Sequence, residues 1–167
     1  METKRSQMQL SFGMIFSIIL IVIFISVAVF AIMKFLDIQN SVEVGKFGND
    51  IQEDIDRLWK GSQGSETREY SLPKKITHVC FIDYNSEQVG DYSLIYEELK
   101  QEFFEFENIF FYPIGSGEGL NSKEIKNIDL TKITESENPL CITNTDGEIR
   151  ILIKKNFGES LVTVGRA

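Results

Sequence analysis

The sequence predicts an α+β protein in which a single N-terminal transmembrane helix continues as an amphipathic stem, followed by a small, mainly antiparallel sheet with one packed helix. Three observations predict this fold. An uncharged apolar run covers residues 14–33. Apolar residues then recur every three or four positions as far as Leu58, which is typical of a helix. Beyond residue 75, several short runs alternate apolar and polar residues, which is typical of strands.

Residues 12–33 are expected to cross a membrane. Fourteen of the 20 residues from 14 to 33 are Ile, Leu, Val or Phe. A helix of that length spans about 30 Å, the thickness of a hydrocarbon core, and its insertion is favourable by on the order of −4 to −8 kcal/mol. A buried helix of a soluble protein would show a polar side. A cleaved secretory signal would have a shorter apolar region and a small-residue cleavage site.

Residues 34–60 are expected to form a helical stem with a narrow apolar seam. The seam changes register beside Gly45 and Gly48, which predicts a bend or a change of neighbour there. Because an apolar seam on a polar helix usually packs against a partner, we expect the stem to contact other membrane subunits. The seam consists of Phe35, Ile38 and Val42, followed by Val44, Phe47, Ile51, Ile55 and Leu58.

Residues 61–68 read as a flexible linker, because they are rich in Gly and Ser, and residues 69–167 as the head domain. Within the head we expect a strand at 76–83, a helix at 92–106 and a strand at 108–112. Residues 140–144, 148–154 and 161–164 are expected to form a three-stranded meander. Its first turn contains Asp146-Gly147, a pair suited to a type I′ turn.

The charge distribution predicts the orientation in the membrane. Residues 1–11 form a short basic leader with Lys4 and Arg5, whereas residues 34–167 contain 15 Lys and Arg against 24 Asp and Glu. Basic residues favour the cytoplasmic side, so the N-terminus is expected in the cytoplasm and the C-terminal domain outside it, at the cell membrane. An acidic head without a basic cluster argues against nucleic acid as a partner.

Two cysteines, Cys80 and Cys141, lie in the expected head. Their spacing matches no zinc motif, which leaves a disulfide or two buried thiols. Outside the cytoplasm a disulfide is permitted, and closing so long a loop stabilises a fold by roughly 4 kcal/mol. We therefore predict that the two are bridged, which requires the strand at 76–83 and the strand beginning at Leu140 to be neighbours.

No catalytic, cofactor-binding or metal-binding residues are predicted, and no cofactor is expected. The single histidine, His78, lies beside Cys80 and is better explained as a strand residue than as half of a nucleophilic pair. The glycine-rich residues 115–119 lack the lysine of a phosphate-binding loop and read as a surface loop. The carboxylates of residues 50–56 match no calcium loop. The chain is therefore expected not to be an enzyme.

The N-terminus resembles that of archaeal type IV pilin-like proteins. The resemblance rests on Lys4-Arg5-Ser6-Gln7 before the apolar helix, and it implies leader cleavage between Ser6 and Gln7. Two positions depart from the pattern: Gln9 stands where Ser is frequent, and Ser11 stands where Glu is usual. The head resembles no characterised family.

These observations lead to two functional hypotheses. In the first, the protein is a pilin-like surface or assembly component that is anchored by one helix and has no catalytic activity. In the second, it is a monomeric membrane-anchored binding or sensor module whose stem folds back onto its own head.

Overall fold

The computed structural model describes residues 12–101 and 106–167 of the chain, which divides into two compact units. The first unit is Met1–Ile38, and its described part belongs to the long helix α1 (Phe12–Lys60). The second unit is Gln39–Ala167 and contains the rest of α1 and all the strands. Each unit is described separately below.

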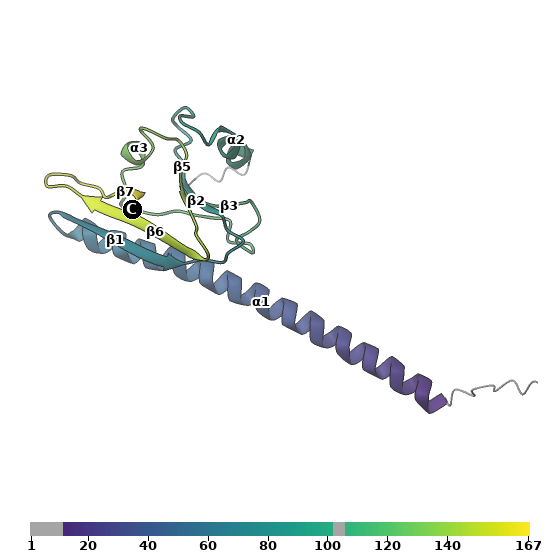
Figure 1. Ribbon diagram of the computed structural model, residues 1–167. Helices are drawn as coiled ribbons and strands as arrows, with labels where there is room; N and C mark the ends of the chain where they lie inside the picture. Colours follow the sequence, from purple (N-terminus) through teal and green to yellow (C-terminus); the bar gives the residue numbers. More distant parts are fainter. Residues whose placement is uncertain (1–11, 102–105) are drawn as a thin grey trace, which may run out of the picture. The chain divides into compact units, whose positions relative to one another are not determined.

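The second unit contains two antiparallel sheets (Figure 1). The three-stranded sheet has the order β1-β6-β7 and the four-stranded sheet the order β4-β3-β2-β5. The strands are β1 (Gly64–Ser71), β2 (His78–Phe81), β3 (Ile109–Tyr112), β4 (Ser122–Lys123), β5 (Leu140–Thr143), β6 (Glu148–Lys155) and β7 (Thr163–Arg166). The remaining helices are α2 (Ser93–Gln101) and the single turn α3 (Leu130–Ile133).

Residues 39–60 of α1 form part of the main hydrophobic core. Figure 1 shows β1 and β6 lying along this part of the helix. The same core contains inward-facing side chains of both sheets, so the helix packs against the two sheets together. The helix contributes Val44, Phe47, Ile51 and Ile55; β6 contributes Ile149, Ile151 and Ile153; the four-stranded sheet contributes Val79, Phe81, Ile109, Phe111, Leu140 and Ile142.

A second, smaller core lies between the four-stranded sheet and α2. Ile95, Tyr96 and Leu99 recur at helical spacing on α2 and are buried there. They pack with Cys80, Ile82, Phe110 and Cys141 from the sheet. The strands β2, β3 and β5 are therefore buried on both faces, which explains why their sequences are almost continuously apolar.

The structure confirms the α+β class but corrects the single sheet to two, and all three described helices, rather than one, contribute to the cores of the head. The linker expected at residues 61–68 is wrong from Gly64 onward, because β1 begins there and pairs with β6 over eight residues. The expected meander is wrong for its first strand, since β5 pairs with β2. Only β6 and β7 are neighbours, with an isolated bridge from Thr145 to Glu148.

Other expectations hold with adjusted boundaries. The strand expected at 108–112 is β3, and the strand expected at 76–83 is shorter, from His78 to Phe81. The helix expected at 92–106 is α2 as far as Gln101, beyond which residues 102–105 lie outside the described part. Asp146 and Gly147 both have positive φ, 57° and 97°, as a type I′ turn requires.

Candidate functional site

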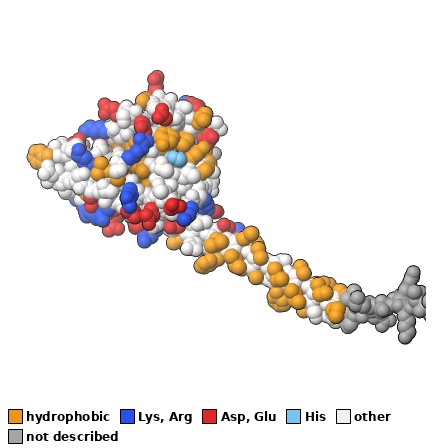
Figure 2. Space-filling model, in the orientation of Figure 1, with side chains coloured by type: hydrophobic (Ala, Val, Ile, Leu, Met, Phe, Trp, Pro, Cys, Tyr) orange, Lys and Arg blue, Asp and Glu red, His pale blue; other side chains and the backbone are white. Residues whose placement is uncertain are grey.

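The most extensive feature with a functional implication is the apolar surface of α1 from residue 12 to 38. None of its side chains is buried, and the large apolar ones are exposed by between 37% at Leu20 and 84% at Phe12. Figure 2 shows apolar side chains along this part of the helix. By length and composition the helix is apolar enough to cross a membrane. The surface is therefore compatible with a membrane anchor.

The hydroxyl groups of the two serines within this apolar segment are hydrogen-bonded inside the helix. Ser17 donates to the carbonyl of Gly13, and Ser26 donates to the carbonyl of Val22, each over 2.8 Å. A hydroxyl bonded one turn back in the helix presents little unsatisfied polarity to its surroundings. Both serines are thus compatible with an apolar environment such as lipid.

The stem seam separates into an exposed part and a buried part. Phe35, Ile38 and Val42 are more than 60% exposed, whereas the side chains from Val44 to Ile55 on the seam are at most 2% exposed. The change of neighbour predicted at the glycines is therefore present, although α1 continues as a helix through both. The apolar seam from Val44 to Ile55 therefore packs against the sheets of its own head.

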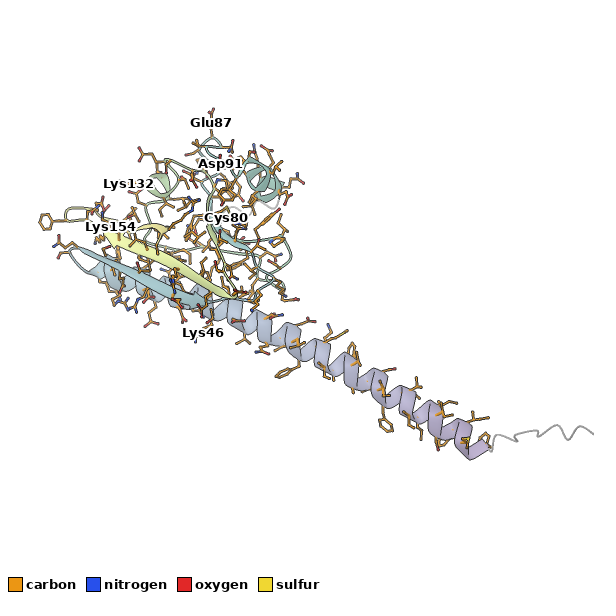
Figure 3. All side chains as sticks on the ribbon, in the orientation of Figure 1. Lys46, Cys80, Glu87, Asp91, Lys132 and Lys154 are labelled. Carbon is orange, nitrogen blue, oxygen red and sulfur yellow. A yellow bond between two sulfur atoms is a disulfide. The ribbon has the colours of Figure 1, made fainter. Side chains whose placement is uncertain are left out.

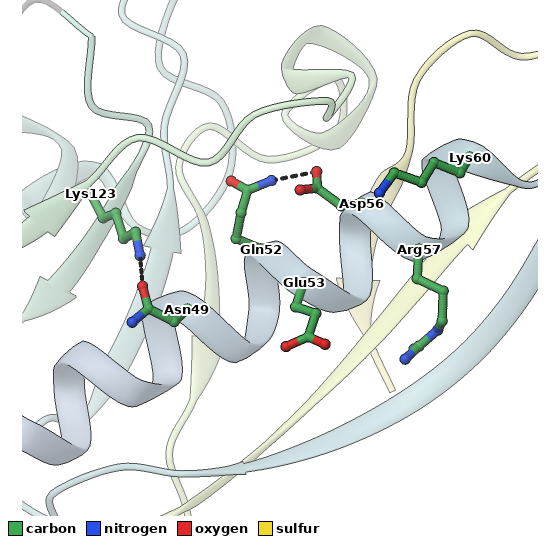
Figure 4. A pocket seen from close by; sticks show the side chains of 7 residues that line it. All are labelled: Asn49, Gln52, Glu53, Asp56, Arg57, Lys60 and Lys123. Atoms are coloured by element: carbon green, nitrogen blue, oxygen red, sulfur yellow. Dashed lines mark hydrogen bonds between the residues drawn. The ribbon is translucent and has the colours of Figure 1, made fainter.

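Gly48 is a position of close packing on α1. A Cβ atom added there would lie 2.8 Å from Cδ of Lys123, whose side chain crosses the helix at this point. Lys123 Nζ donates to Asn49 Oδ1 over 2.8 Å (Figure 4). Burial lowers the pKa of Lys123. The glycine therefore permits close packing between α1 and β4.

Cys80 and Cys141 form a disulfide inside the smaller core. They are directly opposed in the β2–β5 ladder, with Cα atoms 4.0 Å apart, which confirms that the two strands are neighbours. Asn144 N donates to Thr77 O, and counting from that pair places the cysteines at a non-hydrogen-bonded position, where opposed side chains lie closest. In Figure 3, Cys80 lies within the head, whereas the labelled charged side chains are on its surface.

His78 belongs to an aromatic cluster. Its ring lies 5.7 Å from that of Tyr92 and 6.3 Å from that of Tyr112, both in edge-on geometry. Its Nδ1 is 2.9 Å from Thr77 Oγ1. Burial, and secondarily the positive charge of Arg166, lower the pKa of His78. The nearby cysteine is in the disulfide, so the structure offers no nucleophilic pair here.

An open polar hollow lies on the solvent face of α1 (Figure 4). Gln52 donates to Asp56 and accepts from the backbone N–H of Lys126, each over 2.8 Å, and Asn127 also donates to Asp56. These hydrogen bonds connect α1 to the segment that follows β4. The hollow is lined by Asn49, Gln52, Glu53, Asp56, Arg57, Lys60 and Lys123.

The other residues singled out in the sequence are placed as follows. Ser6 and Gln7, at the expected leader cleavage, lie outside the described residues. The glycine-rich loop contains three positive φ angles, at Gly115, Glu118 and Gly119, and is followed by a strand rather than a helix. Within residues 12–101 and 106–167, no group of three His, Cys, Asp or Glu side chains is arranged to hold a metal ion.

Two structurally important polar residues were not predicted. Asn138 is fully buried and bonds the loop after β2, while the buried Lys155 donates to the carbonyls of Trp59 and Gly61 at the end of α1. The only available sequence signals were a polar residue before Pro139 and a lysine at an inward position of β6.

No protein family, curated protein or solved structure matches the chain. Function is therefore inferred from the helix surface, the charge and the disulfide.

Proposed function

We propose that this protein is a single-pass membrane protein whose N-terminus is cytoplasmic and whose acidic head lies outside the cytoplasm. In this proposal it serves as a pilin-like surface or assembly component and catalyses no reaction. The observation that carries the proposal is the apolar helix surface of residues 12–38, on which no side chain is buried. Exposed apolar patches of this size indicate a membrane or protein interaction.

The length of the apolar surface supports contact with other helices as well as lipid. Residues 12–33 span about 33 Å at about 1.5 Å per residue, which covers a hydrocarbon core of about 30 Å. Phe35 and Ile38 continue the apolar surface beyond that length and are 66% and 62% exposed. Helices from neighbouring subunits would cover these side chains, which supports the assembly role.

Cysteine scanning of residues 20–38 in native membranes tests this role. The native cysteines are joined to each other, so each introduced cysteine supplies a free thiol. We expect crosslinks between copies at positions that repeat about every 3.6 residues, because one face of each helix would meet its neighbour. Uniformly monomeric behaviour at every position would contradict assembly.

Mass spectrometry of the mature N-terminus tests the pilin resemblance separately. We expect the mature chain to begin at Gln7, six residues shorter than the sequence given. Recovery of chains beginning at Met1 or Glu2 would remove this support and leave a signal-anchored protein.

A second candidate function is a monomeric anchored binding or sensor module. The burial of Val44, Phe47, Ile51 and Ile55 against their own head favours it, because this part of the apolar seam is already covered within the same chain. Absence of crosslinks in the scan above, together with monomeric migration in mild detergent, would select this function over assembly.

The disulfide supports an oxidising location for the head, since disulfides persist mainly outside the cytoplasm. Thiol labelling of unfolded, unreduced protein from its native membrane tests this. We expect no label per chain, and two labels only after reduction. Two labels without reduction would contradict the bridge and remove this support for an extracytoplasmic location.

A further inference from the structure

Strand β1 is an open edge of the three-stranded sheet. It pairs with β6 alone, in an uninterrupted register from Gly64 to Ser71. Leu72 N donates to Gly147 O in the same register, so the hydrogen-bonded positions of β1 are the even-numbered residues. The N–H and C=O groups of Ser65, Thr67, Glu69 and Ser71 therefore face away from β6. Within the described part of the chain, none of these groups has another hydrogen-bond partner.

The other sheet edges are short or covered. β4 has two residues, and β5 and β7 have four each. At the free edge of β5, Arg166 donates to the carbonyl of Cys141, and Val162, just before β7, is paired with residues 127–129. β1 is eight residues long and contains neither a proline nor a bulge, the usual features that prevent edge pairing. It is therefore suited to accept another strand.

We propose that β1 pairs antiparallel with β1 of a second copy of this chain, with Thr67 opposite Thr67 of that copy. The charges on the strand select this register. It places Glu66 opposite Arg68 of the second copy, and Arg68 opposite its Glu66, at non-hydrogen-bonded positions where side chains are closest. The two adjacent symmetric registers would place Glu66 opposite Glu66 or Arg68 opposite Arg68.

Within its own head, the guanidinium group of Arg68 does not make all the hydrogen bonds it could. Its Nε atom is buried and makes no hydrogen bond among the described residues, although a carboxylate oxygen of Glu66 lies 3.3 Å away. Its Nη2 is 3.5 Å from Asp54, which also pairs with Arg57 over 2.7 Å. A second Glu66 would offer a further carboxylate to this guanidinium group.

The pairing determines how the two heads are oriented. Arg57 contacts Glu66 and Asp54 accepts from Tyr70, so β1 runs back along residues 39–60 of α1. A two-fold axis that reverses β1 therefore also reverses that part of the helix. The chain enters the two heads from opposite ends of the joined sheet. Resting on the membrane anchor proposed above, the pairing joins two membrane-bound copies through their heads.

Chemical crosslinking tests the pairing with the full chain. The protein is reconstituted into liposomes, and flotation measures its incorporation. We expect a water-soluble, lysine-reactive crosslinker to trap a dimer joined through the heads, and Thr67→Pro to abolish this product. Because the N–H of Thr67 faces away from β6, proline there removes no bond of the β1–β6 ladder. The matched control Thr67→Ser should give the same dimer as the parent protein.

Disulfide crosslinking tests the register. Vesicles that carry two differently tagged Thr67→Cys proteins should give a disulfide-linked dimer containing both tags, since Cα atoms at such a position lie about 5.5 Å apart. Ser71→Cys is the control and should give little dimer. The proposal is overturned if incorporated protein gives no dimer through its heads, if Thr67→Pro dimerises normally, or if Ser71→Cys crosslinks equally. Failure of the chain to float with vesicles would instead overturn the anchor itself.

Discussion

At the scale of single residues, Asn138 shows how one buried amide can organise a loop. Its Nδ2 donates to the carbonyls of Asp83, Ser86 and Glu87, and its Oδ1 accepts from the N–H of Asp83. Its backbone also exchanges two hydrogen bonds with Val89. The loop between β2 and α2 is thereby held against the segment before β5.

Replacing Asn138 by alanine should therefore destabilise the head. The change leaves the buried carbonyl and N–H of Asp83 without their partner and removes two further hydrogen bonds to the loop, so we expect a loss of about 2–4 kcal/mol. Denaturant unfolding of the full chain in detergent would measure it. Asn85→Ala, an exposed asparagine in the same loop, should change stability by less than about 0.5 kcal/mol. Equal effects of the two changes would contradict this role.

His78 predicts a pH dependence of stability. Burial lowers its pKa in the folded protein, whereas the unfolded chain titrates near the ordinary value of about 6.5. As the pH falls below about 6.5, the unfolded state binds a proton that the folded state does not, so the stability decreases. Tyr92, Tyr112 and Arg166 surround the ring and supply no acid to reverse this sign.

The measurement compares unfolding of the parent protein and His78→Gln at about pH 7.5 and about pH 5.5. The variant should lose less stability between the two values than the parent. The carboxylates of Glu137 and Glu159 have pKa values lowered by their basic partners, so their contribution is lost only at still lower pH. An identical pH dependence in both proteins would exclude His78 as its source.

At the scale of elements, the end of α1 is fixed by a side chain from β6. Lys155 is only 8% exposed, and its Nζ donates to the carbonyls of Trp59 and Gly61 over 2.6 and 2.9 Å. A cation at a helix C-terminus also interacts favourably with the helix dipole. The lysine thus joins the last turn of α1 to the sheet that packs on it.

Lys155→Met should cost about 1–3 kcal/mol, because it leaves these carbonyls without their donor. The neighbouring Lys154 is exposed on the opposite face of β6, so Lys154→Met is a matched control and should be nearly neutral. Thermal unfolding followed by circular dichroism gives both values. A larger effect at Lys154 would refute the capping role.

The elements also show which parts of the fold the sequence could predict. The buried seam of α1 and the strand β6 have clear periodicities, and β2 and β3 are short apolar runs, so the types of these elements were predicted. β1 was missed because its inward positions carry Glu66 and Arg68, which pair with charged groups of α1 rather than with apolar ones. The partner of β5 was also wrong, because pairing with a strand 60 residues away leaves no local signal.

At the scale of the whole molecule, the candidate site was predicted in part. The apolar run and the cysteine pair could be recognised from composition, spacing and loop-closure arguments. The split of the stem seam could be seen as a change of register, but the side chains that bury its second half come from distant strands. The open edge of β1 was not foreseen, since the strand itself was expected to be a linker.

The division into two units predicts where the chain can be cut. A fragment of residues 39–167 keeps the complete core and should fold, with the Cys80–Cys141 bridge formed. A fragment of residues 66–167 loses the four buried side chains of α1, each worth about 2–5 kcal/mol, which together match the whole stability of a small domain. Circular dichroism and proteolysis distinguish them, and stable folding of the shorter fragment would contradict this account.

The burial of residues 39–60 in the core has a mechanical consequence. Tension that enters the head through residue 39 acts directly on the contacts of Val44, Phe47, Ile51 and Ile55. Because β1 and β6 run alongside this segment (Figure 1), a lengthwise pull shears these contacts together instead of peeling them one after another. The head should therefore resist tension until these contacts break together in a single step. Beyond that point, the bond between Cys80 and Cys141 would keep the 61-residue stretch it closes from extending.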